Sequence, residues 1–164
     1  MGKLIIIRGP AAVGKTTIVK ALAKRLRGIA IHLDVELEQR GLDTAGDHYC
    51  IPVENFLEAL RVLRADLQYH LASGTSVIID GCFYHEEMLD YLDERVDAPT
   101  TVYTLHASLE TCITRDRERG KPIGEESIRA VHKLASRVAI GTTIDTEGRG
   151  VEKVIEQLMQ RMTE

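Results

Sequence analysis

The chain has 164 residues, which is the usual length of one domain. Its 44% of hydrophobic residues is enough for a sizeable core, while a formal net charge of −4 gives no general attraction to nucleic acid or anionic membranes. Aromatic residues make up only 4% of the chain and Trp is absent, which argues against a surface that stacks single-stranded bases.

Strand-like and helix-like segments alternate along the whole chain. Residues 4–7, 30–33, 77–79, 101–105 and 143–144 are short and mostly apolar or β-branched, as strands covered on both faces are. The alternation predicts βαβ units and one three-layer αβα domain over residues 1–164, built on a parallel sheet. Apolar residues with the spacing of one helical face lie between the strands and after the last one. They are Ile18, Leu22 and Leu26; Phe56, Leu60, Leu63, Leu67 and Leu71; Met88, Leu92 and Val96; and Val151, Val154, Ile155, Leu158 and Met162.

Several residues mark expected helix ends. Ser108 is placed to cap a helix after the fourth strand, with Glu110 in its first turn. Another helix is expected to start at Glu125. Gly28 and Gly74 stand where helices should stop.

The first predicted strand leads into Gly9-x-x-x-x-Gly14-Lys15-Thr16, and an amphipathic helix follows. Glycines allow a tight turn whose backbone N–H groups point into one small volume, and the helix adds the positive end of its dipole. This arrangement binds polyphosphates, so the segment predicts a P-loop for ATP. The alternative is a glycine-rich turn that ends in a surface lysine.

The P-loop fixes the expected contacts to nucleotide. Lys15 should bridge the β- and γ-phosphates, and the Thr16 hydroxyl should bind Mg²⁺. Arg149, in the loop after the last strand, is placed to stack on the adenine unless that loop is an ordinary turn. The predicted nucleotide-binding residues are Gly9, Ala11, Ala12, Val13, Gly14, Lys15, Thr16, Thr17 and Arg149.

A carboxylate closes the third predicted strand, in Val77-Ile78-Ile79-Asp80-Gly81. Ligands gather at the carboxyl ends of parallel strands, so Asp80 lies beside the P-loop if the third strand neighbours the first. There it would hold a water of the Mg²⁺ ion or orient the attacking hydroxyl. The alternative is an Asp that only caps the next turn.

Arg115 and Arg119 stand four residues apart in a charged segment and therefore share one helical face. Arginines neutralise the charge that spreads over a transferred phosphoryl group, and a mobile segment that carries them also excludes water. We therefore predict a lid over about residues 115–125. A solvated, charged helix end is the alternative.

Residues 34–72 follow the second predicted strand and are expected to bind the phosphoryl acceptor. A carboxylate at the strand end can take a proton from an acceptor hydroxyl or hydrogen-bond to it, and Asp34 and Glu36 are the two candidates. In a purely structural alternative, Asp34 is the N-cap of a short helix. Three basic residues, Arg40, Arg61 and Arg64, are candidates for binding an anionic acceptor.

The cysteines and the apolar runs indicate the cellular compartment of the protein. Cys50, Cys82 and Cys112 are odd in number and far apart, which favours reduced thiols. The apolar run at residues 4–7 is too short for a signal peptide or a membrane span. We therefore expect a cytoplasmic protein that does not bind membranes.

These residues together resemble the small P-loop kinases, a group that includes adenylate kinase, shikimate kinase, gluconate kinase, chloramphenicol phosphotransferase and polynucleotide-kinase-like enzymes. The resemblance covers essentially the whole chain, but only the P-loop is specific in sequence. It implies a five-stranded parallel sheet of order 2-3-1-4-5 and Mg-ATP as phosphoryl donor. Asp34 then resembles the acceptor-binding acid, and Arg115 and Arg119 resemble the lid arginines. Asp80 is most similar to its counterpart in the chloramphenicol-phosphotransferase and polynucleotide-kinase-like branch.

Three functions follow as hypotheses. The first is a Mg-ATP-dependent phosphotransferase for a small-molecule or nucleotide acceptor, a monomer or homodimer, with Lys15, Asp34, Arg115 and Arg119 as catalytic residues. The second is a nucleic-acid end kinase or RNA-processing factor, which the acidic pI of about 5.9 makes unlikely. The third is a regulatory ATPase or nucleotide sensor without a small-molecule acceptor.

Overall fold

A computed structural model of the chain describes residues 1–46 and 48–163. Asp47, inside the predicted acceptor region 34–72, and Glu164, at the end of the predicted domain, lie outside the described residues. Five parallel strands form one sheet of order β2-β3-β1-β4-β5, which confirms the predicted fold class. The strands are β1 (Leu4–Arg8), β2 (Ile29–His32), β3 (Val77–Gly81), β4 (Thr100–His106) and β5 (Thr142–Asp145).

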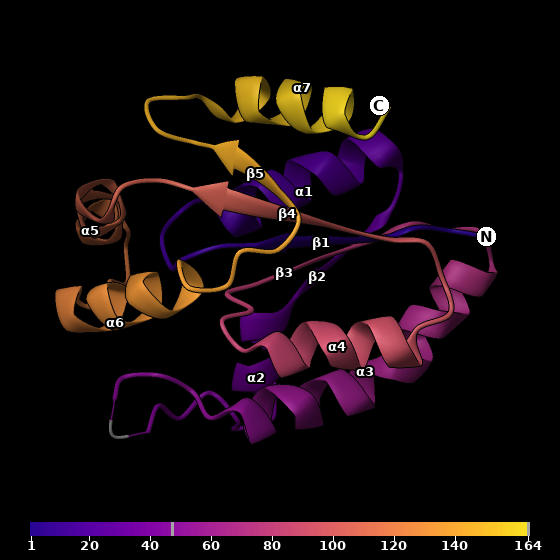
Figure 1. Cartoon of the computed structure of the whole chain (residues 1–164), viewed down its shortest axis with the longest axis horizontal. Coiled ribbons are helices and arrows are strands. Elements are labelled where there is room, and N and C mark those ends of the chain that lie inside the picture. Colours follow the sequence, from indigo (N-terminus) through magenta and orange to yellow (C-terminus); the bar gives the residue numbers. More distant parts are fainter. Residues whose placement is uncertain (47, 164) are drawn as a thin grey trace.

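Helices cover both faces of the sheet and give the three-layer arrangement (Figure 1). The helices α1 and α7 pack together on one face, while α3 and α4 pack together on the other. The helices α5 and α6 contact each other near the carboxyl ends of β4 and β5. Their bounds are α1 (Lys15–Leu26), α2 (Leu33–Gln39), α3 (Val53–Ala72), α4 (Glu86–Arg95), α5 (Leu109–Glu118), α6 (Glu125–Ala135) and α7 (Val151–Arg161).

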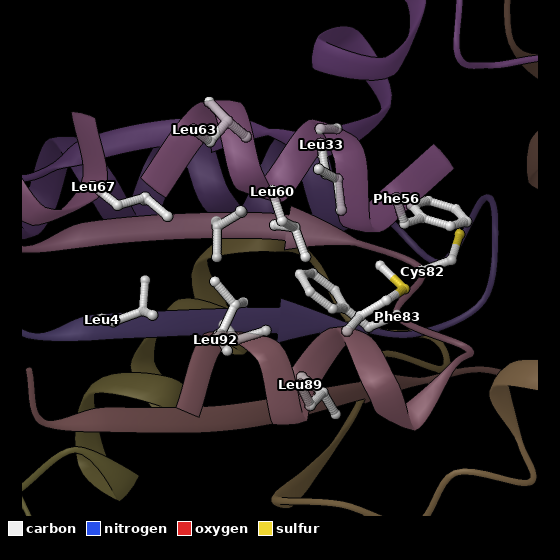
Figure 2. Close-up of a cluster of buried hydrophobic side chains, with 14 of the residues drawn as sticks. Leu4, Leu33, Phe56, Leu60, Leu63, Leu67, Cys82, Phe83, Leu89 and Leu92 are labelled. Atoms are coloured by element: carbon white, nitrogen blue, oxygen red, sulfur yellow. The ribbon is translucent and has the colours of Figure 1, made fainter. Parts of the chain in front are cut away.

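Alternation along each strand divides the apolar side chains between two cores. In β1, Ile5 and Ile7 join the cluster under α1 and α7, whereas Leu4 and Ile6 join the cluster under α3 and α4. Figure 2 shows the second cluster, in which leucines of α3 and α4 surround Leu4 of β1 and Phe83. A sheet buried on both faces explains why its central strands read as continuous apolar runs.

The helix ends described here follow the capping preferences of their residues, and one end lies one residue earlier than predicted. The Ser108 hydroxyl accepts a hydrogen bond from the Thr111 amide at 3.2 Å, which confirms the predicted N-cap of α5. At the end of α1 the left-handed position is held by Arg27, one residue before the predicted Gly28. In the last stripe, Val151 is 38% exposed because α7 turns it away from the sheet, while Val154, Ile155 and Leu158 are buried.

The register of the sheet brings the candidate residues to one edge. Asp80 lies beside Ile7 of β1 and beside His32 of β2, so the third strand does neighbour the first. The P-loop, the start of α2, and the helices α5 and α6 all follow the carboxyl ends of strands, where ligands collect in open parallel sheets (Figure 1). Among the described residues, none of the helices combines the length and the apolar character needed to cross a membrane.

Candidate active site

The loop between β1 and α1 has the backbone conformation of an anion nest. Gly9 has φ of 145°, and a Cβ there would stand 2.5 Å from the carbonyl oxygen of Leu105, so both conformation and space require glycine. Gly14, directly before α1, has φ of 104°, and Ala12 has φ of 61°. Left-handed residues among right-handed ones turn successive N–H groups toward a common centre, and α1 starts immediately after them.

Lys15 is held inside this loop. Its ammonium donates to the carbonyl oxygens of Gly9 at 3.1 Å and Pro10 at 2.8 Å, and the side chain is only 6% exposed. Its position over the loop lets it meet an anion that enters the nest.

The charge on Lys15 is set by opposing effects. Burial works to lower the pKa of Lys15, but the interactions with Cys82, Asp34 and Asp80 outweigh burial and raise the pKa. Burial raises the pKa of the Cys82 thiol to about 11, so this thiol is neutral at pH 7. The two carboxylates are therefore the partners that keep Lys15 cationic near neutral pH.

Asp80 is buried at the end of β3 and is hydrogen-bonded by His32, which the sequence pattern does not indicate as a site residue. It is 1% exposed, and its Oδ2 lies 2.6 Å from Nδ1 of His32 on the neighbouring strand. Burial raises the pKa of Asp80, and the hydrogen bond from His32 counteracts that rise. Asp80 also interacts electrostatically with Lys15 and Asp34, although it is not among the described residues that line the cavity over the P-loop.

A cavity of about 830 Å³ opens over the P-loop. It brings together Lys15, Thr16, Asp34, Arg115 and Arg119. The residues that line it are Ala11, Ala12, Gly14, Lys15, Thr16, Thr17, Asp34, Glu38, Asp43, Ile51, Arg115, Arg119, Gly120, Lys121, Pro122 and Ile123.

The two acceptor-side acids differ in their surroundings. Asp34 is exposed in the first turn of α2 and lines the cavity. His32 occupies the N-cap position of α2, so the alternative of Asp34 as N-cap is wrong. Glu36 accepts from the guanidinium of Arg40 at 2.5 Å, in the same helix. Of the two acids, Asp34 is the one free to meet an acceptor in the cavity.

Arg115 fastens the P-loop to the loop after β5. Its guanidinium donates to the carbonyl oxygen of Val13 at 3.1 Å and to the hydroxyl and carbonyl oxygens of Thr146 at 3.2 Å and 3.0 Å. Thr146, which is buried, also donates to the carbonyl oxygen of His106 at 3.0 Å. The sequence shows Thr146 only as a polar residue after a strand, so its structural role had no separate signal.

The predicted lid segment is anchored by a buried carboxylate. Asp116 is 2% exposed and accepts hydrogen bonds from the backbone amides of Ile123 and Gly124 at 3.0 to 3.1 Å. It also lies 3.6 Å from the guanidinium of Arg119. Gly120, Lys121, Pro122 and Ile123, between these anchor points, line the cavity. In sequence, Asp116 is hidden in a run of alternating charges.

The side chain of Arg149 contacts neighbouring residues of β5 and α7. Its guanidinium donates to the side chain of Gln157 at 3.0 Å and lies 3.7 Å from Asp145. It is not among the described residues that line the cavity. Stacking of Arg149 on an adenine therefore remains a prediction that requires these contacts to open.

Between α2 and α3, in the predicted acceptor region, Asp43 and Ile51 line the cavity. The Tyr84 hydroxyl, after β3, accepts from the amide of Ile51 at 2.8 Å and donates to its carbonyl oxygen at 3.2 Å. Elsewhere in this segment, the Tyr49 side chain interacts with Glu126 in the first turn of α6, and this interaction raises the pKa of Tyr49. The segment thus spans from the sheet edge to the helix that follows the lid.

The residues present fit a metal ion that arrives with the nucleotide. No group of three or more His, Cys, Asp or Glu residues in the described part of the chain is arranged to hold a metal by itself. Mg²⁺ is commonly bound by one or two protein oxygens together with substrate phosphates and water. Thr16, which lines the cavity, and Asp80, which interacts electrostatically with Lys15, are the candidate oxygen donors.

The sheet order, the nest and the buried lysine together define a P-loop fold of the small-kinase type. The family model described as "AAA domain" matches residues 4–138, which is most of the chain. The chain therefore belongs to this AAA domain family.

Solved structures show the same fold at low sequence identity. A sugar kinase from Janibacter sp. HTCC2649 has a TM-score of 0.77 and 21% identity, over 98% of this chain and 94% of that one. A tunicamycin resistance protein from Deinococcus radiodurans has a TM-score of 0.70 and 23% identity, over 99% and 96%. Shikimate kinase from Aquifex aeolicus has a TM-score of 0.63 and 19% identity, over 98% and 96%.

One curated protein matches a segment of the chain. It is a tRNA dimethylallyltransferase from Anaeromyxobacter sp. (strain Fw109-5), 40% identical over 58 residues. This match covers 32% of the chain and only 19% of that protein. It is a likeness of a segment and not of the whole protein.

Proposed function

We propose that the protein is a Mg-ATP-dependent phosphotransferase that moves the γ-phosphoryl group to a hydroxyl of a small acceptor. The observation that carries this proposal is one cavity lined by Lys15 and Thr16 of the nest, by Asp34, and by Arg115 and Arg119 of the predicted lid. A donor site, an acceptor-side base and a cationic cover are the parts that phosphoryl transfer needs. The kinases among the structures of similar fold support the same reaction class.

In the proposed reaction, the acceptor oxygen forms a bond to the γ-phosphorus while the bond from that phosphorus to the bridging oxygen of ADP breaks. Asp34 takes the proton of the acceptor hydroxyl. Lys15 leaves the carbonyl oxygens of Gly9 and Pro10 and binds the β- and γ-phosphates, and Arg119 turns from Asp116 toward the transferred group. Bound Mg²⁺, held through Thr16 and Asp80, would neutralise phosphate charge.

The first prediction tests the nest lysine. Lys15→Ala should lower phosphoryl transfer by about a thousandfold, because one positioned cation on a transferred phosphoryl group is worth on that order. Labelled ATP incubated with panels of sugars, nucleosides, nucleotides and short oligonucleotides reveals the acceptor, and the same assay gives the rate of each variant.

The control is Lys20→Ala, an exposed lysine in the middle of the same helix α1, which should transfer at the wild-type rate. A Lys15→Ala protein that transfers as fast as this control would overturn the mechanism. ATP binding without transfer to any compound class would instead favour the regulatory ATPase, and strongly salt-dependent oligonucleotide binding would favour the nucleic-acid end kinase.

A further inference from the structure

His32 contacts the buried Asp80, and the proposed reaction assigns a purpose to Asp80 but none to His32. His32 is the last residue of β2, and its ring nitrogen Nδ1 lies 2.6 Å from Oδ2 of Asp80. The side chain of His32 is 18% exposed and that of Asp80 is 1% exposed. A contact this short and this well shielded from water is a strong interaction, unlike the exposed ion pairs elsewhere on the chain.

The pleat of the sheet places this pair on the face of the sheet that α1 covers. The neighbours Ala30 and Ile78, two residues earlier in each strand, pack in the cluster under α1. Side chains two residues apart share a face, so His32 and Asp80 project toward α1 as well. The first turn of α1 carries Lys15 and Thr16, and Asp80 interacts electrostatically with Lys15.

We propose that His32 is a positioning residue that fixes the rotation of the Asp80 carboxylate. Its ring N–H donates to Oδ2, so that Oδ1 is the oxygen presented toward the start of α1, where the magnesium ion of a bound nucleotide would lie. A short side chain such as Asp turns freely when nothing engages it, and an oxygen that points at random binds a metal or its water poorly. The inference rests on the proposed use of Mg-nucleotide, but not on transfer to any acceptor.

The chain supplies a matched control in a second His–Asp pair. His106 and Asp145 stand at the carboxyl ends of the paired strands β4 and β5, 3.9 Å apart. Their side chains are 59% and 47% exposed, so the contact is weak and screened. Replacing His106 removes the same residue type from the same kind of strand end without touching Asp80.

Calorimetric titration with a non-hydrolysable ATP analogue, with Mg²⁺ and with excess EDTA, tests the proposal. His32→Ala should weaken binding of the magnesium complex by about tenfold and leave metal-free binding unchanged, since loss of a residue that orients a metal ligand typically has an effect of that size. His32→Asn, whose amide N–H can replace Nδ1–H, should recover most of the loss. His106→Ala should match wild type in both titrations.

Proton NMR of the wild-type protein gives a second readout that does not depend on nucleotide. An imidazole N–H shared with a buried carboxylate should give a slowly exchanging, far-downfield signal that persists in His106→Ala and is lost in His32→Asn. Absence of that signal in the wild type would overturn the pairing. Equal weakening of metal-bound and metal-free binding in both His32 variants would show a merely structural role.

Discussion

Arg8, the last residue of β1, is a buried cation whose burial the sequence does not predict. It is 0% exposed, and its guanidinium donates to the carbonyl oxygens of Phe83, Ala135 and Val138 and to the Thr104 hydroxyl, at 2.7 to 3.3 Å. Burial lowers the pKa of Arg8. One side chain, directly before Gly9, thus joins β1 to β4, to the loop after β3 and to the end of α6.

Arg8→Met should destabilise the fold by about 3 kcal/mol, because the aliphatic length is kept while several buried oxygens lose their donor. Urea denaturation followed by circular dichroism measures the change. Arg25→Met, at an exposed position near the end of α1, is the control and should leave the midpoint within error of wild type. A stability of Arg8→Met equal to that of this control would contradict the structural role.

At the scale of elements, the predicted lid differs from an unrestrained loop. Asp116 in α5 accepts from the amides of Ile123 and Gly124, so the segment leaves the helix at one end and is tied back to it at the other. A carboxylate that satisfies backbone amides holds the ends of the segment while its middle lines the cavity. The tie also keeps Arg119 near the helix.

Asp116→Ala should loosen this lid. Limited trypsin digestion should cut after Arg119 several-fold faster, because the freed segment fits a protease site more readily. Hydrogen exchange at Ile123 and Gly124 should rise in the same variant. Glu118→Gln, exposed at the end of the same helix, should digest at the wild-type rate. If Asp116→Ala were digested at the wild-type rate, Asp116 would not restrain the segment.

The elements were largely predictable because their signals are local. Each predicted strand is present with bounds that differ by no more than two residues, and the Ser108 cap follows from a side chain and its own first turn. The contacts of Arg8, His32 and Asp116 were not predictable. Each depends on partners brought close by folding: His32 and Asp80 are 48 positions apart, and Arg8 and Val138 are 130 positions apart.

For the molecule as a whole, the charges that line the cavity differ between the P-loop and predicted lid and the predicted acceptor region. The cations that line the cavity belong to the P-loop and the predicted lid: Lys15, Arg115, Arg119 and Lys121. The charged residues of the predicted acceptor region that line the cavity are Asp34, Glu38 and Asp43. Arg40, Arg61 and Arg64, the candidates for an anionic acceptor, are not among the described residues that line the cavity, and Arg40 and Arg61 pair with Glu36 and Glu58.

This division predicts that the acceptor is uncharged or cationic. A carboxylate or phosphate on the acceptor would face Asp34, Glu38 and Asp43, and none of the described residues from 34–72 that line the cavity is a cation. Like charges at close range are unfavourable. Matched compounds isolate the effect: glucosamine, glucose and glucuronate share one ring, and adenosine and AMP share one nucleoside. In the labelled-ATP assay at low salt, the cationic or neutral member of each set should be the better acceptor, by about tenfold.

A charge change in the protein tests the same prediction from the other side. Asp43→Lys should narrow the preference against anionic compounds, since it replaces one acid of the predicted acceptor region by a cation and leaves the P-loop and Asp34 in place. Raising the salt concentration should also reduce the difference in rate between anionic and neutral acceptors, because screening weakens long-range repulsion. If glucuronate or AMP proved the better acceptor in the wild type, the acceptor would lie closer to the lid cations than to these acids, and the division of the cleft would be wrong.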